Sequence, residues 1–435
     1  MKRLLKTVLL LATIIVLISP RLMTHAAGKG LQIYIAGGLS QPQQDWFAKT
    51  LFPAFAKANP DFDAASSSVI TSTWGQFDTS VQGWLSTGSG PDVVYLGSEY
   101  ASIYGKVLAN IDDQIKSWPD LKNYLPAALQ TATYNGHMVG LPVLVGIRAR
   151  YYRTDISKPS GKDFKVPATF ADDIAFVKAN TIVKDNAVQQ QAYVDIGSAL
   201  FDGQEFVANI WGAGGELYNA DGTSAFDSPA TAEALQYMYD RRRAVLANDK
   251  VATLPAFQGP PLASGKVISG IFPTWNLPDH KDKLWDSIIV APYPAGKSGK
   301  QLIQVFTDWL SVPAYTQNKD LAVKFLEFIG SKDNALALSA TSADSPGFGW
   351  VPVRTDAWGD LQKDVVWKQL LDLAQKYGRG YSDIRASAEL RPLIDTEVTK
   401  FLTDQQSLQD TQTALKTQYD AILQKSGLVG TAAAK

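Results

Sequence analysis

The chain has 435 residues, of which 46% are hydrophobic and 19% charged, so it can fill two or three packed domains and is not intrinsically disordered. It contains no cysteine and three histidines, which excludes disulfides, thiolate metal sites and a histidine-rich metal centre. The net charge of −1 argues against a nucleic-acid-binding protein, because such proteins carry a basic face.

Residues 1–27 have the pattern of a secretory signal peptide. Three basic residues among the first six precede a run of fourteen uncharged residues, 7–20, and Ala26 and Ala27 provide the small residues that signal peptidase requires. We therefore expect an exported protein, periplasmic or associated with the cell surface. Because Arg21 interrupts the segment after the apolar run, an uncleaved membrane anchor stays open as the alternative.

In the first third of the chain, predicted strands alternate with predicted helices. The β-rich run 31–36 ends at Gly37 and Gly38, which indicates a strand followed by a turn. A helical pattern covers residues 43–59, and residues 92–96 form an apolar run typical of a buried strand. Between them, one helix face is predicted from apolar residues at helical spacing: Phe77, Val81, Trp84 and Leu85.

The alternation continues through the rest of the chain. Thr169 and Asp172 have the spacing of a capping box, and Asn318 precedes another helical pattern. Further strands are predicted at 267–272 and 287–291, and the chain is helical from Asp364 almost to its end. Strands separated by helices imply βαβ units and mainly parallel sheets, so the predicted class is α/β with a helical C-terminal region.

Motifs for catalysis and for metal binding are absent or incomplete. No phosphate-binding loop and no GxSxG elbow occurs. Asn219 to Gly222 resembles part of a calcium loop, but Leu217 and Ser228 occupy positions that need ligands, so a β-turn is predicted. His137 lies in a turn. We predict no metal site and no cofactor, while paired carboxylates leave a secreted glycosidase open as an alternative.

Four stretches, spread over most of the chain, resemble the extracellular solute-binding proteins of ABC importers. They are TGSGPDVVYLG (87–97), YNGHMVGLP with YYRTD (134–142 and 151–155), WGAGGEL with FDSP (211–217 and 226–229), and SGKV with FPTW (264–267 and 272–275). Their order and spacing are similar to the carbohydrate-binding branch of that family, which includes maltose-binding protein.

The resemblance implies two α/β lobes, each a mostly parallel sheet flanked by helices, joined by a hinge around a cleft in which a sugar binds. The expected boundaries are 28–147 and 309–340 for the N-terminal lobe, 148–308 and 341–426 for the C-terminal lobe, and 427–435 for a disordered tail. The expected crossings between the lobes are near 145–150, 306–310 and 339–350. The implied partner is an ABC permease, and the binding protein itself is expected to be a monomer.

Two departures from the family limit what the resemblance implies. The chain lacks the cysteine that tethers many relatives to a membrane, and Gly146 stands where maltose-binding protein has a ligand-binding glutamate. A malto-oligosaccharide is therefore not inferred.

Candidate binding residues are the aromatic and acidic side chains near strand ends, because sugars need flat apolar surfaces and planar polar groups. Trp275 follows the strand 267–272 and matches the family's stacking tryptophan, and Glu99 follows the strand 92–96 where sugar-binding relatives keep an acid. Asp308 and Trp309 interrupt an apolar run, where an acid is costly unless it is paired or binds a ligand. The remaining candidates are Glu205, Trp74 and Trp350. Core packing is the alternative for each tryptophan, and a helix-start acid for Glu99.

Arg148 and Arg150 alternate, so that both point to one face of a strand. One of them, with Arg148 as the candidate, could bind hydroxyls or a carboxylate of the solute, or both could form an ion pair between the lobes. Because the candidate set is aromatic and acidic, we expect a neutral oligosaccharide or an amino-sugar oligomer. A binding protein for a non-sugar solute is the alternative.

We predict that Trp275→Ala weakens sugar binding while leaving the fold intact, because stacking buries apolar ring area worth about 25 cal/mol per Å². Calorimetry with the sugar and the melting temperature of the solute-free variant test this. A core tryptophan would instead cost about 3–5 kcal/mol of stability. A large loss of solute-free stability with affinity retained would therefore overturn the assignment.

Overall fold

The computed structural model describes residues 30–185, 187–194, 199–246, 262, 265–274, 284–340, 347–348, 351–382 and 384–429. The expected signal peptide (1–27), Trp275, Trp350 and most of the expected tail lie outside these residues. Across the described ranges, none of the helices combines the length and the apolar character that a membrane span requires.

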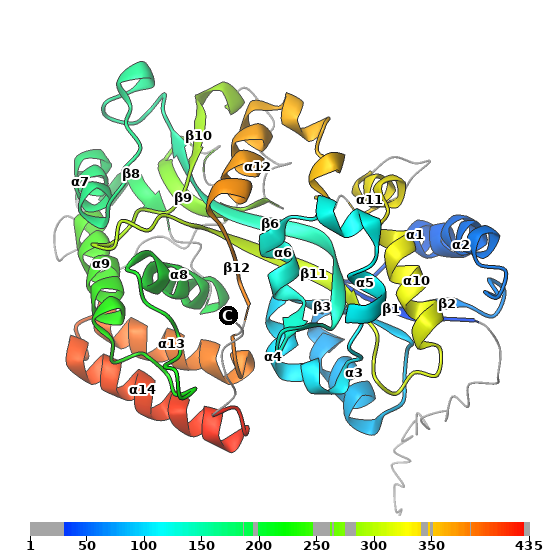
Figure 1. Ribbon diagram of the computed structural model, residues 1–435. Helices are drawn as coiled ribbons and strands as arrows, with labels where there is room; N and C mark the ends of the chain where they lie inside the picture. The colour runs from blue at the N-terminus through cyan, green and yellow to red at the C-terminus, as the bar shows by residue number, and fades with distance from the viewer. Residues whose placement is uncertain are drawn as a thin grey trace, which may run out of the picture.

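Ten strands of the described chain form a single twisted sheet that runs through the whole molecule (Figure 1). Its order is β2-β1-β3-β11-β6-β9-β8-β7, with β10 on β6 and β12 on β11. The strands are β1 (Gln32–Ala36), β2 (Ser68–Ser72), β3 (Val93–Gly97), β6 (Gly140–Arg153), β7 (Ile182–Lys184), β8 (Ala187–Val194), β9 (Val267–Pro273), β10 (Ile288–Ala291), β11 (Ile303–Ser311) and β12 (Gly378–Gly380). A separate hairpin pairs β4 (Thr133–Tyr134) with β5 (His137–Met138).

The two longest strands of this sheet, β6 and β11, form an antiparallel ladder at its centre. Their register extends from Gln304 opposite Arg148 to Ser311 opposite Gly140, with a shift between Asp308 and Trp309. The parallel pairing expected from the alternation of strands and helices is found where β1 pairs with β2 and β3, and where β8 pairs with β9. The centre is antiparallel because β6 and β11 run the length of the sheet in opposite directions instead of closing βαβ units.

Helices cover both faces of this sheet (Figure 1). They are α1 (Gln41–Trp46), α2 (Phe52–Ala58), α3 (Trp74–Thr87), α4 (Ala101–Tyr104), α5 (Asp112–Ile115), α6 (Pro126–Thr131), α7 (Phe170–Asn180), α8 (Ala199–Gly212), α9 (Pro229–Leu246), α10 (Lys319–Gly330), α11 (Lys332–Ser339), α12 (Val365–Tyr377), α13 (Ser387–Leu402) and α14 (Leu408–Lys425). The capping box predicted at Thr169 and Asp172 is confirmed at the start of α7. Asn318 precedes α10 as predicted, but its side chain binds Asp92 instead of capping the helix.

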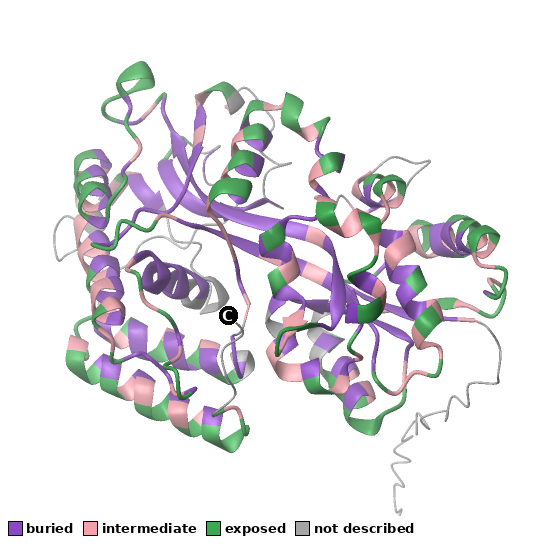
Figure 2. Cartoon of the chain, viewed as in Figure 1, coloured by how far each residue is buried: buried purple, intermediate pink, exposed green. Residues whose placement is uncertain are grey.

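Buried side chains divide into two hydrophobic cores, which define two lobes (Figure 2). The first core joins β1, β3 and most of β6 and β11 to α2, α10 and α12, and we call this part the first lobe. The second core joins residues of β8 and β9 to α8, α9, α13 and α14, which make the second lobe. Because β6 begins in one core and ends in the other, one sheet serves both lobes.

The boundary expected at residue 341 is wrong for α12. Val366, Leu370 and Ala374 of this helix pack in the first core, as does Phe348. The chain joins the second core only at Tyr381. Among the described residues, the third crossing is therefore β12, which pairs with the beginning of β11. Most of the expected crossing 339–350 lies outside the described residues.

The motif at 87–97 has a structural reason. A side chain at position 90 would collide with the ring of Trp84, which explains why glycine stands there. Asp92 is buried and accepts hydrogen bonds from the Gln32 backbone at 2.9 Å and the Asn318 side chain at 3.1 Å. Asp92 thus joins the beginnings of β1, β3 and α10. This part of the motif therefore stabilises the first lobe, and it does not by itself indicate a ligand.

Candidate functional site

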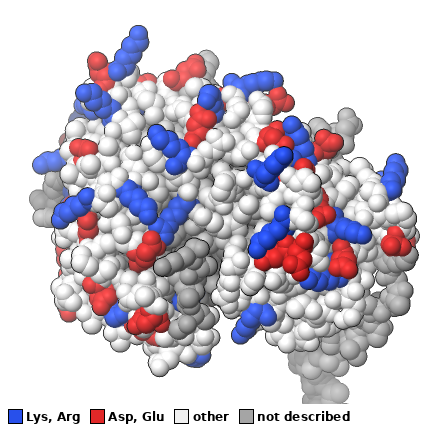
Figure 3. Space-filling model, in the orientation of Figure 1, with Lys and Arg blue, Asp and Glu red and all other residues white. Residues whose placement is uncertain are grey.

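A groove lies between the two lobes on the face shown in Figure 3, and on its first-lobe side the visible surface carries few charges. From the first lobe, β3 ends at Gly97 and leads through a short turn into α4. From the second lobe, the segment before α13 approaches α4, and Ser102 Oγ donates a hydrogen bond to the Ile384 carbonyl at 3.2 Å. The middle of β11 lies at the base of this junction, because it pairs with both β3 and β12.

Asp308, a predicted site residue, lies on β11 near this junction. Its side chain is half-buried, it stands opposite Gly97 of β3, and it accepts a hydrogen bond from the Tyr95 hydroxyl. Burial, together with the Asp308 carboxylate, raises the pKa of Tyr95 well above its ordinary value of 10. The hydroxyl therefore stays protonated and orients the carboxylate of Asp308, which suits that group to accept a hydrogen bond from a solute hydroxyl.

The position of Glu99 is fixed next to Asp308. Ser98 Oγ donates to the Thr307 carbonyl at 2.9 Å and accepts from the Thr307 backbone N–H at 2.7 Å. These two bonds hold the end of β3 against β11, and Glu99 is the second residue of the turn Ser98–Tyr100 that follows. The side chains of Glu99 and Trp74 lie outside the described part of the structure.

Trp309 packs in the first core, against expectation. Its side chain has 0% exposure, and an added side chain on Gly140 would collide with its ring. The register shift between Asp308 and Trp309 interrupts the regular alternation of β11. Trp309 therefore has no surface for a solute to contact, and its aromatic character serves packing.

Glu205 was predicted to bind the solute but is buried in an ion pair. Its carboxylate lies 2.5 Å from Arg241 and accepts a hydrogen bond from the Tyr193 hydroxyl at 2.7 Å. Burial alone would raise the pKa of Glu205, but Arg241 and Tyr193 outweigh it and hold the pKa below its ordinary value of 4.5. Glu205 is therefore a charged member of the second core, away from solvent.

Arg150 belongs to the same buried cluster. It forms an ion pair with Asp173 at 3.0 Å, with both side chains fully buried, and donates to Ser269 Oγ at 2.9 Å. Its guanidinium also lies 4.0 Å from the centre of the Tyr193 ring. The ion pair is thus within the second lobe, and the alternative of an ion pair between the lobes is wrong for Arg150.

Arg148 is committed to protein contacts as well. It donates to the Gln204 side chain on α8, and its guanidinium lies 4.5 Å from the centre of the Phe306 ring. Only 4% of Arg148 is exposed. It is therefore buried beside Phe306, on the same face of the sheet.

Sequence reasoning missed Phe306 and the loop after β1. Phe306 is half-buried beside Asp308, but it stands within an apolar run that resembles an ordinary core strand. Gly37 and Gly38 have φ of 99° and 79°, which glycine adopts without strain. This loop follows β1 at the carboxyl edge of parallel strands, where open α/β sheets bind ligands. The Gly-Gly turn was therefore the sequence feature that could have indicated a binding loop here.

Nothing in the described part of the chain suggests a metal centre, since it contains no group of three or more His, Asp or Glu residues placed to hold an ion.

Comparison with known proteins identifies relatives over most of the chain. The model of the bacterial extracellular solute-binding protein family matches residues 40–336. A binding protein of Brucella abortus is 22% identical over 312 residues, which cover 68% of this chain and 73% of that protein.

Solved structures show the same fold. An ABC transporter solute-binding protein from Thermotoga lettingae, bound with α-D-tagatose, has a TM-score of 0.68 at 20% identity, covering 91% of this chain and 100% of that one. The sugar-binding protein MalE from Xanthomonas citri has a TM-score of 0.74 at 16% identity, covering 91% and 98%. The architecture is therefore the α/β periplasmic-binding-protein fold, as expected from the sequence.

We predict that Glu205→Gln destabilises the solute-free protein by about 3–5 kcal/mol at pH 7, because it leaves Arg241 buried without its partner charge. The loss is full above pH 4.5 and shrinks as the pH falls through the lowered pKa of Glu205, where the parent carboxylate is itself protonated. Denaturant unfolding of the parent and the variant, at pH 7 and at a pH below 4.5, measures this difference in stability.

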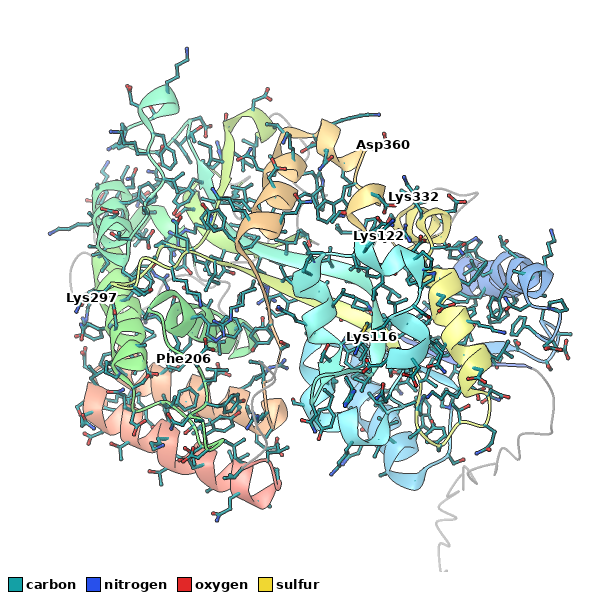
Figure 4. The ribbon with its side chains drawn as sticks, in the orientation of Figure 1. Lys116, Lys122, Phe206, Lys297, Lys332 and Asp360 are labelled. Carbon is teal, nitrogen blue, oxygen red and sulfur yellow. The ribbon has the colours of Figure 1, made fainter. Side chains whose placement is uncertain are left out.

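The matched control is Asp360→Asn at the periphery (Figure 4), whose ion pair with Lys363 is exposed, so that its removal should leave the stability nearly unchanged. If the Glu205→Gln variant were as stable as the parent but had lost affinity for the solute, the account would be contradicted and Glu205 would belong to the binding site.

Proposed function

The chain belongs to the bacterial extracellular solute-binding protein family, and from that membership we propose that it captures a neutral sugar, an oligosaccharide or an amino-sugar oligomer, between its lobes. It is the non-catalytic solute-binding component of an ABC transporter, so the glycosidase alternative is discarded. In this proposal the exported protein acts as a monomer and delivers the sugar to a membrane permease.

The observation that carries the proposal is the position of Asp308 and Phe306. Both are half-buried, and both lie on one face of β11 where this strand joins the two lobes. A carboxylate oriented by Tyr95 can accept hydrogen bonds from sugar hydroxyls, and the exposed part of the Phe306 ring is apolar. Sugars present both kinds of surface. The sugar-binding neighbours in the comparison, one of them bound with tagatose, support the same ligand class.

The charges around the groove favour a neutral solute over an anionic one. Arg150 is neutralised by Asp173, and Arg148 is buried in contact with Gln204 and Phe306. The half-buried Asp308 would repel an anion, because like charges close together in a partly desolvated site are costly.

Binding is proposed to draw the lobes together. A solute that contacts both lobes interacts more favourably with a closed arrangement than with an open one, and only such a difference can shift the equilibrium between them. The lobes are joined by the crossings β6, β11 and β12, which makes a hinge movement of this kind geometrically simple.

A thermal-shift screen tests the ligand class. It would contain neutral di- to tetrasaccharides, amino-sugar oligomers, phosphorylated and carboxylated sugars, and short peptides. At about 100 times its dissociation constant, a ligand stabilises the protein by roughly 2.7 kcal/mol. We expect the shift from neutral or amino sugars. A shift only from anionic compounds or peptides would contradict the proposal and favour a non-sugar solute.

For the sugar found in that screen, we predict that Asp308→Asn weakens binding by about 1.5–3 kcal/mol, the range for hydrogen bonds to a charged group. Asparagine keeps an acceptor for Tyr95, so the fold is retained. Isothermal titration calorimetry measures the loss, with Asp372→Asn on the outer surface of α12 as the control. Equal affinities of the parent and Asp308→Asn would remove Asp308 from the site.

A further inference from the structure

Each of the three described segments that cross between the lobes contributes one side chain to a single stack. Arg148 comes from β6, Phe306 from β11, and Tyr381 from the residue that follows β12. The Arg148 guanidinium lies 4.5 Å from the centre of the Phe306 ring. The Tyr381 ring is stacked on Phe306 with 4.6 Å between centroids and 30° between planes. The Phe306 ring thus contacts both a cation and a second ring.

The backbone geometry makes room for this stack. Gly146 stands directly opposite Phe306 in the β6–β11 register and carries no side chain, while Arg148, on the same face of β6, reaches the ring diagonally. The Tyr381 backbone N–H donates to the Val305 carbonyl at 2.8 Å, which continues the pairing of β12 with β11. Gly146 is therefore part of the packing at the hinge.

All three crossings are also attached to one helix of the second lobe, α8. Gln204 accepts a hydrogen bond from Arg148 through its side chain, and through its backbone carbonyl it accepts one from Gln304 of β11 at 2.7 Å. Trp211, further along α8, packs against Tyr381 with 6.2 Å between centroids.

The attachment to α8 extends beyond the stack. Arg379 of β12 places its guanidinium 3.9 Å from the centre of the Trp211 ring and pairs with Glu216. The ion pair between Glu205 and Arg241 fixes α8 to α9, and Phe206 anchors the helix in the second core (Figure 4). The three crossing segments are therefore held together by α8 where they enter the second lobe.

On the first-lobe side, the same strands pack in the first core and make specific contacts with β3 and α6. Ser98 and Thr131 both bind Thr307, and β12 approaches α6 so closely that a side chain on Gly380 would lie 2.7 Å from the Ala127 carbonyl oxygen. A rotation of one lobe against the other must therefore bend β6, β11 and β12 next to the stack.

We infer that the stack of Arg148, Phe306 and Tyr381 sets the resting angle between the lobes, and so affects affinity through the lobe arrangement, in addition to any contact that Phe306 makes with the solute. Arg148 and Tyr381 are positioning residues in this account. The inference rests on the proposed function, because it concerns the movement that accompanies solute capture.

The thermodynamic consequence distinguishes positioning from contact. A change in the ratio of open to closed protein alters the apparent affinity of every solute by the same factor. Removing one member of an aromatic or cation–π stack changes such a ratio by up to about tenfold. A contact residue would affect different solutes unequally.

The experiment measures the distance between the lobes directly, without any solute. The chain has no cysteine, so spin labels can be attached at introduced cysteines only. Gln82 on α3 and Gln424 on α14 are exposed positions in the first and second lobes. Pulsed electron–electron double resonance would measure the distance between the two labels. The distance distribution of the labelled parent would be compared with those of the labelled Phe306→Leu and Arg148→Met variants.

We expect both variants to give a broader or displaced distribution. The matched control is Phe328→Leu, a half-buried phenylalanine of α10 whose ring packs against Phe55 and Phe325 of the first lobe. It should lower the melting temperature and leave the distribution unchanged. Should Phe306→Leu fail to fold, Arg148→Met still tests the stack.

A distribution identical to that of the parent in a folded stack variant would overturn the inference. This outcome is independent of the proposed function, because no solute is present. Conversely, if the solute screen returned only anions or peptides while the distributions still broadened, the ligand class would be wrong and the hinge assignment would stand.

Discussion

The antiparallel ladder between β6 and β11 is the constraint on which the rest of the structure depends. Because both strands pass through the two cores, the lobes share one sheet and cannot separate without breaking backbone hydrogen bonds. The lobes can still bend about these strands, and the surface above the bend is where both lobes meet. Asp308 and Phe306 lie there because β11 changes partner at that point, from β3 to β12.

The second lobe is made rigid by an unusual core. Arg150, Asp173, Glu205 and Arg241 are all buried, and two cations are matched by two carboxylates. Burying isolated charges would be prohibitive, whereas paired and hydrogen-bonded charges are tolerated and fix the geometry of their neighbours. The cluster joins α8 to α9 and β6, so that the helix that receives the hinge side chains has a defined position.

Much of the fold could be predicted from the sequence, because it is specified by local patterns. The strand at 31–36, the capped start of α7 and the amphipathic α3 follow from alternation, spacing and capping. The site was less predictable. Glu205 has the composition of a ligand residue, and only the distant Arg241 and Tyr193 make it a core residue. Phe306 was hidden in an apolar run, and the third crossing depends on long-range pairing of β12 that no local pattern encodes.

The central claim, that solute binds between the lobes and draws them together, is tested most directly by small-angle X-ray scattering. The radius of gyration would be measured for the solute-free protein and at saturation with the sugar identified by screening. We predict a smaller radius in the bound state, because the groove closes over its ligand. An unchanged radius at saturation would contradict the account and place the solute in a rigid pocket of one lobe.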